Sequence, residues 1–225
     1  MVRKKYKQLH QLLDQYLTSY DIGQSYDFDQ ITLEINKEYL YEISKVLKET
    51  KQLDFSMLID LCGVDYLHYG LDNWETQSVS GTGYSRATLK TKNTHDGSNN
   101  DQPKRFAVIY HLLSMSHNWR LRLRIFTGSK NPPSVDSVVS IWPTANWFER
   151  EAFDLFGIDF EGHPDLRRIL TDYEFIGHPF RQDFPTSGNL EVYYDEDEEK
   201  VKYRPVSVTT RPTVPRVIRK EKRNK

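Results

Sequence analysis

The sequence predicts an α+β fold: a two-layer domain with a mixed, mainly antiparallel sheet and helices, followed by a long extended C-terminal arm. Three observations predict it. Apolar side chains recur at three- and four-residue steps in two N-terminal segments, which is the period of a helix. They alternate with polar side chains farther along the chain, which is the period of a half-buried strand. The C-terminal part combines charge runs with Pro and has neither period. The expected domains are residues 1–185 and an arm over residues 186–225.

The N-terminal part is expected to fold as helix, strand and helix. Residues 6–17 place Tyr and Leu at helical spacing, with Lys and Gln on the other face. Residues 27–35 are expected to form a strand, because Ile and Leu alternate there with Thr and Glu. Asn36 can cap a second helix that runs to about Glu49 and turns its Leu, Ile and Val side chains inward.

Three strand segments follow. Residues 55–67 contain a short apolar strand that leads to Gly63. Residues 105–113 are apolar enough for a central strand that is covered on at least one face. In residues 121–125, Leu and Ile alternate with two Arg side chains, so this strand should have one wet or ion-paired face.

A polar excursion is expected over residues 72–104, which are dominated by Ser, Thr, Asn, Gly and Asp. Such composition is typical of loops and hairpin tips. Residues 93–103 carry no recognisable function. After a turn at residues 131–133, which contain two Pro, an apolar stretch extends over residues 135–142.

Residues 145–185 hold the most informative pattern of the chain. Asn146 is a plausible N-cap, with Glu149 three positions later, and Gly157 is a plausible C-terminal cap, so a helix of about three turns is expected. Apolar side chains surround most of this helix, and Asp154 falls on the remaining polar strip together with Arg150.

Glu149 and Glu151 fall inside the apolar arc of this helix. An unpaired carboxylate there would cost several kcal/mol, so each should meet an Arg, a Lys or backbone N–H groups. Arg167, Arg168 and Arg181 are the candidate partners. Two interpretations stay open: a core helix whose Glu side chains reach solvent from its edges, or a helix wedged between its own sheet and another chain.

Two Gly-His-Pro turns, at His163 and His178, bracket the stretch that follows the helix. The residue before each Pro is driven out of the α region. Two His near acidic residues could suggest a metal site, but this stretch has no Cys and no His pair at i,i+3 or i,i+4. Structural roles are therefore favoured, and no metal ligand is predicted.

A search for catalytic patterns gives no active site. Gly81-Thr82-Gly83 lacks the later Gly of a dinucleotide loop, and there is no Walker-type loop. Ser114 and His117 are close in sequence but lack the Gly-x-Ser-x-Gly elbow. The single Cys, Cys62, lies in an apolar run and is expected to be a buried, inert thiol in a reducing compartment. Neither a secretory signal nor an 18-residue apolar run is found.

The net charge of −1 gives no general reason to expect nucleic acid as a partner. Charge is unevenly distributed, however, because an acidic run at residues 195–199 precedes a basic tail over residues 200–225. A nucleic-acid-binding module would use this tail and the strand of Arg122 and Arg124. Its stacking surfaces would be Trp119, Trp142 and Trp147.

The tail itself is expected to be extended. Residues 191–194 and 201–204 are two β-prone pieces that could pair as a hairpin around the acidic run. Residues 211–215 contain two Pro and cannot be helical. Such an arm can order against a folded neighbour by strand addition and Arg pairing.

Several stretches resemble the 30 kDa subunit family of NADH-quinone oxidoreductase, which is respiratory complex I. The matching stretches are Glu149-Arg150-Glu151-Ala152-Phe153-Asp154-Leu155-Phe156-Gly157, His163-Pro164-Asp165-Leu166-Arg167-Arg168-Ile169-Leu170 and Gly177-His178-Pro179-Phe180-Arg181, together with residues 60–66, 105–113 and 215–219. The resemblance covers nearly the whole chain, and its central motifs mix charged, aromatic and turn residues in a fixed order. The equivalent subunits of plastid-type NAD(P)H dehydrogenase and of membrane-bound hydrogenases share the central motifs.

The resemblance implies a non-catalytic peripheral-arm subunit of a proton-translocating enzyme. It would pack on the quinone-site subunit, which is of the 49 kDa type, and near the Fe-S subunits, on the cytoplasmic side of the bacterial inner membrane. It would bind no cofactor itself, since FMN and the Fe-S clusters belong to partner subunits, and it would reach the membrane only through the complex. The resemblance also implies that the following residues lie at subunit interfaces: Glu149, Arg150, Glu151, Asp154, His163, Arg167, Arg168, His178 and Arg181.

Overall fold

The computed structural model describes residues 4–28, 30–67, 69, 79–80, 83–84, 104–128 and 131–207. Most of the expected polar excursion and the end of the expected arm, including residues 211–215 and most of the basic tail, lie outside the described residues. The chain divides into two compact units. One comprises residues 1–67 and 99–184, and the other comprises residues 68–98 and 185–225.

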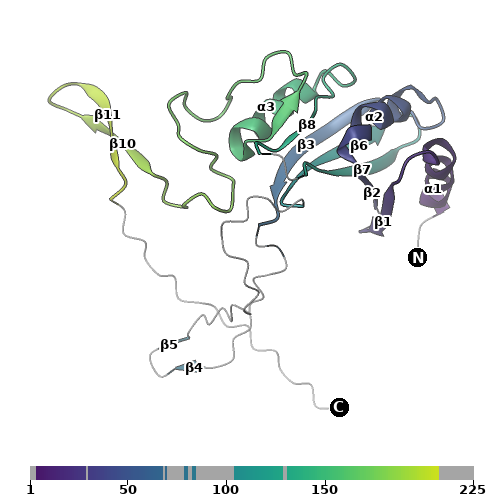
Figure 1. Cartoon of the computed structure of the whole chain (residues 1–225), viewed down its shortest axis with the longest axis horizontal. Coiled ribbons are helices and arrows are strands. Elements are labelled where there is room, and N and C mark those ends of the chain that lie inside the picture. The colour runs from purple at the N-terminus through teal and green to yellow at the C-terminus, as the bar shows by residue number, and fades with distance from the viewer. Residues whose placement is uncertain are drawn as a thin grey trace. The chain divides into compact units, whose positions relative to one another are not determined.

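A five-stranded mixed sheet forms the centre of the first unit (Figure 1). Its strands follow the order β1 (Gly23–Asp27), β2 (Gln30–Ile35), β7 (Trp119–Phe126), β6 (Phe106–Ser114) and β3 (Met57–Asp65). β2 and β7 are parallel, and the other neighbouring pairs are antiparallel. The expected mixed, mainly antiparallel sheet is therefore confirmed.

Helices cover the inward face of this sheet. They are α1 (Lys4–Leu17), the short 3₁₀ helix η1 (Lys37–Tyr39) that leads into α2 (Leu40–Glu49), and α3 (Ala145–Phe156). The apolar sides of α1, α2 and α3 join the inward side of the sheet in one core cluster. The helices and the sheet together form the α+β fold that the sequence predicts.

A row of side chains across four strands shows how the core is built. Leu33, Leu123, Tyr110 and Leu61 are neighbours in register on β2, β7, β6 and β3, and each is buried. Every second residue of a strand points to the same face. The alternation of Leu and Ile in residues 121–125 therefore places the apolar side chains of β7 in the core.

The opposite face of the sheet is polar, as expected for the strand with alternating Arg. Arg124 on β7 pairs with Glu34 on β2 at 2.7 Å, and Arg122 donates to Gln30 at 3.2 Å. Cys62 is a free, half-buried thiol on β3, and burial raises its pKa.

One predicted element differs from the structure. The single strand expected over residues 27–35 is a hairpin of β1 and β2, because a turn at Phe28, whose φ is +51°, ends β1 at Asp27. The apolar stretch over residues 135–142, for which the sequence predicts no element, begins within the short strand β8 (Ser134–Asp136), which pairs in parallel with β9 (Asp159–Glu161). The rest of that stretch turns into α3, and Trp142 donates from its indole N–H to the carbonyl oxygen of Phe55 at 3.0 Å.

The second unit contains the hairpin of β10 (Leu190–Asp195) and β11 (Lys200–Pro205), together with the two-residue strands β4 (Val79–Ser80) and β5 (Gly83–Tyr84). The hairpin expected around the acidic run is therefore confirmed. Within the described residues, no helix combines the length and the apolar character that crossing a membrane requires.

Candidate functional site

The candidate site is the signature segment, residues 145–185, which contains α3 and the irregular chain that follows it. α3 packs closely on β3 because Gly63 has no side chain. A Cβ atom at Gly63 would lie 2.6 Å from the ring of Phe156 on α3. Real Cβ contacts are not that short, so this glycine sets how near the helix approaches the sheet.

The start of α3 differs from the prediction. The helix begins at Ala145, its N-cap is Thr144, and no side chain caps it. Asn146 therefore lies within the helix, and the expected capping box with Glu149 is wrong. The physical reason is that the Glu149 carboxylate is engaged elsewhere, in the core of the first unit.

Glu149 is fully buried and binds the turn after β8. Its carboxylate accepts hydrogen bonds from the Ser137 hydroxyl at 2.6 Å and from the Val138 backbone N–H at 2.8 Å. Burial raises its pKa to about 7, against the opposing effect of these two hydrogen bonds. The expectation of an Arg partner is wrong for Glu149, whereas the expectation of a backbone N–H is confirmed.

Asp154 is the centre of the signature segment, and its predicted place on a polar strip is wrong. The side chain is fully buried, and its carboxylate accepts hydrogen bonds from the backbone N–H groups of Ile169, Leu170 and Thr171 at 2.8–3.1 Å. The Thr171 hydroxyl also donates to it. Burial alone would raise the pKa of Asp154, but the Thr171 hydroxyl and the three N–H groups outweigh it and lower the pKa to about 2.

Arg168 completes the shell around Asp154. Its guanidinium lies 3.0 Å from the Asp154 carboxylate and also donates to the Thr171 hydroxyl and to the carbonyl oxygen of Gly177. A carboxylate with this many donors strongly favours its ionised form. Residues 168–171 are therefore folded around a side chain of α3, although they have no regular secondary structure.

Arg150 holds the same stretch from the outer side of the helix. Its guanidinium donates to the carbonyl oxygens of Arg167 and Arg168 at 3.1 and 3.2 Å and lies 5.4 Å from the centre of the Trp147 ring. A planar guanidinium can serve several acceptors in fixed directions, which Lys cannot do.

The first Gly-His-Pro turn is tied to the beginning of α3. One ring nitrogen of His163 lies 3.2 Å from the carbonyl oxygen of Asn146, and the other accepts the backbone N–H of Asp165 at 3.0 Å. His163 therefore has a structural role, as the sequence suggested. Gly162, which precedes it, has a positive φ of +84°.

The second Gly-His-Pro turn caps the other end of α3. A helix leaves its last carbonyl groups without internal partners. Here the carbonyl oxygen of Asp154 lies 2.9 Å from Nδ1 of His178, that of Leu155 accepts the Phe180 N–H at 3.1 Å, and that of Phe156 accepts Nε of Arg181 at 2.6 Å. We call residues 177–184 the C-terminal strap.

Gly157 makes this cap possible. It adopts the left-handed conformation with φ of +69°, as the sequence predicts for a C-terminal cap. A Cβ atom there would lie 2.5 Å from both Arg181 and His178. Burial lowers the pKa of His178 and that of Arg181 from their ordinary values.

A buried ionic cluster anchors the end of the strap, and sequence reasoning did not identify it as a site. Arg105 and Asp65, with side chains 2% and 1% exposed, form a bidentate pair with distances of 3.1 and 3.2 Å. Arg105 also reaches Asp183 at 2.7 Å, while the Gln182 N–H donates to Asp65 at 3.0 Å. The available signal was an Arg at the start of an apolar central strand and an Asp at the end of another.

The sequence also predicts that Arg150, Glu151, Arg167, Arg168 and Arg181 are buried in charge pairs within or between subunits, and this prediction is only partly confirmed. Arg168 pairs with Asp154, whereas Arg150 and Arg181 donate to backbone carbonyl groups. Arg167 and Asp165 pair at 2.8 Å, but both side chains are more than half exposed. Glu151 is exposed as well, which agrees with the interpretation in which a Glu reaches solvent from the helix edge. Contacts of these residues with another chain stay a prediction.

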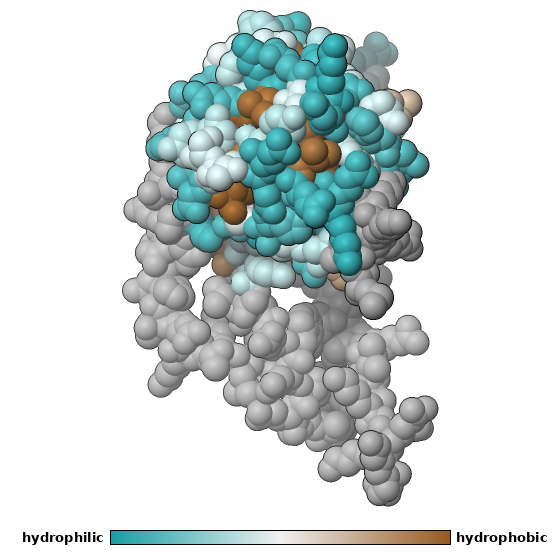
Figure 2. Space-filling view, turned by 90° about the vertical axis from the view of Figure 1, so that its right-hand side faces the viewer, coloured by the Kyte–Doolittle hydropathy of each residue, from teal (hydrophilic) through white to brown (hydrophobic). Residues whose placement is uncertain are grey.

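The signature segment carries several exposed apolar side chains. Five of them are more than half exposed: Trp147 at 62%, Leu170 at 63%, Tyr173 at 85%, Ile176 at 71% and Phe180 at 59%. We call these five residues the apolar outer surface. By contrast, the side that carries α1 and β1 in Figure 1 is largely hydrophilic, with small separate apolar patches (Figure 2).

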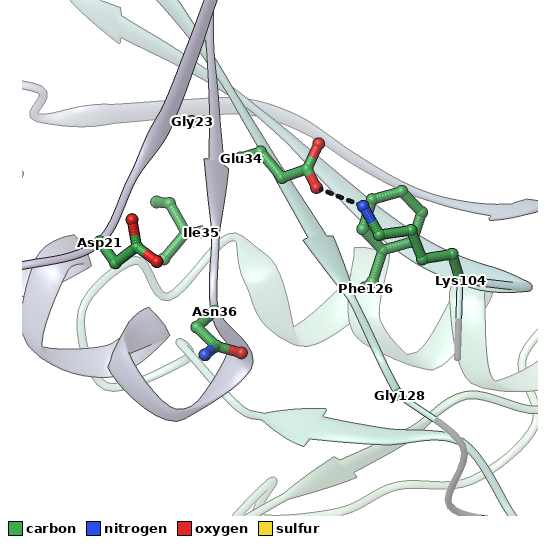
Figure 3. Close-up of a pocket in the computed structure, with 8 residues that line it drawn as sticks. All are labelled: Asp21, Gly23, Glu34, Ile35, Asn36, Lys104, Phe126 and Gly128. Atoms are coloured by element: carbon green, nitrogen blue, oxygen red, sulfur yellow. Dashed lines mark hydrogen bonds and ion pairs between the residues drawn. The ribbon is translucent and has the colours of Figure 1, made fainter.

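A cavity of about 420 Å³ lies where the parallel strands β2 and β7 end (Figure 3). Glu34 and Lys104 face each other in it and form an ion pair at 3.0 Å, and the Lys104 ammonium lies 5.1 Å from the centre of the Phe126 ring. None of the residues that the sequence singled out as a site lines this cavity. Among the described residues, no group of three His, Cys, Asp or Glu side chains could hold a metal ion.

The surfaces proposed for a nucleic-acid module are mostly occupied. Trp119 and Trp142 are 4% and 2% exposed and belong to the core. Arg124 is paired with Glu34. Of the three proposed stacking residues only Trp147 is exposed, and it lies within the signature segment rather than beside the Arg strand.

Comparisons with known proteins agree with this description. Residues 33–190 match the family model described as respiratory-chain NADH dehydrogenase, 30 Kd subunit. The chain is 49% identical over 193 residues to the C subunit of NADH-quinone oxidoreductase from Hydrogenovibrio crunogenus, and the match covers 86% of each chain. It is 48% identical over 195 residues to the protein of the same name from Coxiella burnetii, over 87% of this chain and 85% of the relative.

A solved structure supports the fold alone. A chain of an archaeal membrane-bound sulfane sulfur reductase is 16% identical, with a TM-score of 0.53, over 85% of this chain and 97% of that chain.

Proposed function

The chain belongs to the family of the 30 kDa subunit of respiratory-chain NADH dehydrogenase, and we propose that it is a non-catalytic subunit of a proton-translocating NADH:quinone oxidoreductase. Membership in the oxidoreductase complex follows from the family. The proposal concerns what the chain does there: it supplies shape and contacts, while electrons pass from NADH through FMN and Fe-S clusters held by partner subunits to quinone.

The apolar outer surface is the observation that carries this proposal. Exposed Trp, Tyr and Phe side chains such as these are enriched at protein–protein interfaces. A buried carboxylate, a C-terminal cap and an ionic anchor hold this irregular segment in place. We expect the partner to be the quinone-site subunit of the 49 kDa type, with the Fe-S subunits as further neighbours.

The location follows from the same proposal. The chain would lie on the cytoplasmic side of the bacterial inner membrane and reach the membrane only through the complex. Two relatives named as the C subunit of NADH-quinone oxidoreductase are 48–49% identical in sequence to most of this chain. This similarity favours the bacterial respiratory assignment over the plastid-type and hydrogenase-type alternatives.

Replacing Trp147 by Ser tests the proposed interface. We expect it to lower the amount of assembled complex at least about tenfold, because an exposed Trp at an interface commonly contributes about 2 kcal/mol or more. Met115, 65% exposed on the turn between β6 and β7, supplies the control Met115→Ser. Assembly is measured by native gel and by subunit quantification in purified membranes.

Glu151→Ala probes the charged border of the same surface. It should lower the amount of assembled complex more than the NADH:quinone turnover per assembled complex, because the residue is expected to pair across the interface. Normal assembly combined with lost turnover would count against a structural role. If Trp147→Ser and Met115→Ser lowered the amount of assembled complex equally, the signature segment would not form the interface.

A further inference from the structure

The hairpin of β10 and β11 has two faces of different chemistry. In the observed register Leu190 lies opposite Pro205, Val192 opposite Tyr203, and Tyr194 opposite Val201. Because alternate residues of a strand share a face, these six residues form one side of the hairpin. That side is entirely apolar or aromatic.

The other side of the hairpin is held by ion pairs. Lys202 lies 2.7 Å from Asp195 and 2.6 Å from Glu198, and Arg204 pairs with Glu191. The Arg204 guanidinium also lies 4.9 Å from the centre of the Tyr193 ring. Cross-strand pairs of opposite charge stabilise a hairpin and fix its register. These charged side chains therefore have their ion-pair partners within the hairpin.

The apolar side has no comparable cover within the described chain. The exposed fractions of its residues are 49% for Leu190, 57% for Val192, 60% for Tyr194, 60% for Val201 and 49% for Tyr203. A two-stranded hairpin alone is at best marginally stable in water, and it gains stability when one face packs against another surface. The register that the ion pairs fix keeps all five side chains on the face that a partner would cover.

The charge of the hairpin restricts the kind of partner. Residues 190–205 contain six acidic and three basic side chains, a formal net charge of −3. Asp195 and Glu198 are paired with Lys202, but within the described chain Glu196, Asp197 and Glu199 at the tip have no ion pair. An anionic lipid surface would repel this tip, and basic side chains would attract it.

We propose that the apolar face of this hairpin docks on a neighbouring protein subunit of the same complex, on an apolar strip bordered by Lys or Arg side chains near the hairpin tip. The proposal rests on the proposed function, since it requires that the chain be part of a complex. It adds a second contact, separate in sequence from the apolar outer surface of the signature segment.

Cleavage at the hairpin tip tests the proposal in the purified complex. A glutamate-specific protease should cut after Glu196, Glu198 or Glu199 at least about tenfold more slowly in the assembled complex than in the free full-length chain. Tyr203→Thr changes the apolar face and should restore fast cleavage, while the chain still assembles through the signature segment. Tyr193→Thr makes the same exchange on the polar face and should behave like the wild type.

Photocrosslinking identifies the occupant without relying on the stability of a variant. A photoreactive p-benzoylphenylalanine in place of Tyr203 should crosslink to one other subunit, and the reaction should weaken in the variant Glu196→Lys/Asp197→Lys/Glu199→Lys. Crosslinks to lipid, to a second copy of this chain, or to its own residues 208–225 would overturn the proposal, as would equal cleavage rates in the free and assembled chain.

The outcome separates the two proposals. If the wild-type chain is absent from the purified oxidoreductase, the proposed function fails. If it is present but its hairpin is cleaved as fast as in the free chain, only the hairpin proposal fails.

Discussion

Two carboxylates on one helix show how much a residue depends on its neighbours. Glu149 and Asp154 are both fully buried on α3, yet burial raises the pKa of the first to about 7, while donors lower that of the second to about 2. Glu149 accepts two hydrogen bonds, whereas Asp154 accepts bonds from three N–H groups, a hydroxyl and a guanidinium. The deeper desolvation of the Glu149 carboxylate and the larger number of donors to Asp154 give the two pKa values opposite shifts.

Asp154 should make the chain sensitive to acid. Its native pKa of about 2 lies below the ordinary 3.8, so it contributes about 2 kcal/mol above pH 4 that is lost as the pH falls toward 2. Asp154→Asn should lower the free energy of unfolding at pH 7 by about 2–4 kcal/mol, measured by urea denaturation. The control Asp165→Asn removes an exposed carboxylate and should cost about 0.5 kcal/mol or less.

Glu149 should have the opposite pH dependence. Its native pKa of about 7 lies above the ordinary 4.5. Between these values the folded chain holds a proton that the unfolded chain has released, so stability falls as the pH rises. Glu149→Gln keeps a hydrogen-bonding side chain without the charge. It should match the wild type near pH 4.5 and exceed it by up to about 3 kcal/mol above pH 7.

The measurement for Glu149 is the difference between urea midpoints of the two proteins across pH 4.5–8. The half-buried His111 and His178, whose pKa values burial lowers, contribute the opposite slope in both proteins and cancel in the difference. A constant difference across this range would show that Glu149 titrates normally.

At the scale of elements, α3 is completed by a segment without regular structure. Its C-terminal carbonyl groups accept hydrogen bonds from the strap, and its Asp154 carboxylate accepts hydrogen bonds from the backbone of residues 169–171. Chain segments that look like loops in the sequence are thus part of the helix cap. The two Gly-His-Pro motifs serve the two ends of α3: His163 contacts the first turn and His178 the last.

Gly157→Ala should test this cap. The left-handed φ by itself costs about 1–2 kcal/mol for a side-chain-bearing residue, and the new Cβ would also displace Arg181 and His178. Gly162→Ala is the matched control, because Gly162 has a φ of +84° and nothing within 4 Å of the added Cβ. We expect Gly157→Ala to lower thermal stability clearly more than Gly162→Ala. Equal losses would show that the strap does not depend on this contact.

At the scale of the whole molecule, the end of the signature segment is fixed by residues distant in sequence. Asp65 lies at the end of β3, Arg105 immediately before β6 and Asp183 in the strap, and they meet in one cluster around the buried Arg105. This cluster closes the first compact unit, whose last residue is Phe184. The hairpin belongs to the other unit.

Ending the chain after Pro185 should therefore separate folding from assembly. The shortened chain keeps Asp183 and should retain a cooperative thermal transition within a few degrees of that of the full chain. It should retain fewer partner subunits than the full chain in pull-down experiments, because it keeps the signature segment but lacks the hairpin and the rest of the arm. Loss of the thermal transition would mean that the arm is needed for folding, and unchanged pull-down would mean that it makes no contact.

The sequence by itself determined the elements and the family. Periodicity predicted α1, α2 and β7, since local spacing fixes which face of a helix or strand is apolar. The apolar run of residues 105–113 predicted β6, and two β-prone pieces predicted the β10–β11 hairpin. Gly157 was identified as a cap, because only glycine adopts positive φ without strain. The motifs of the signature segment were sufficient for the resemblance to the 30 kDa subunit family.

Only the tertiary structure decided which polar groups meet. Glu149 binds Ser137 rather than a helix cap, Asp154 is buried rather than exposed, and Arg105 pairs with Asp65 across 40 residues of sequence. A hydrogen bond or ion pair depends on atoms within a few ångströms, and its partners can lie anywhere along the chain. Periodicity reports the face on which a side chain lies, whereas its partner is set by how distant segments pack.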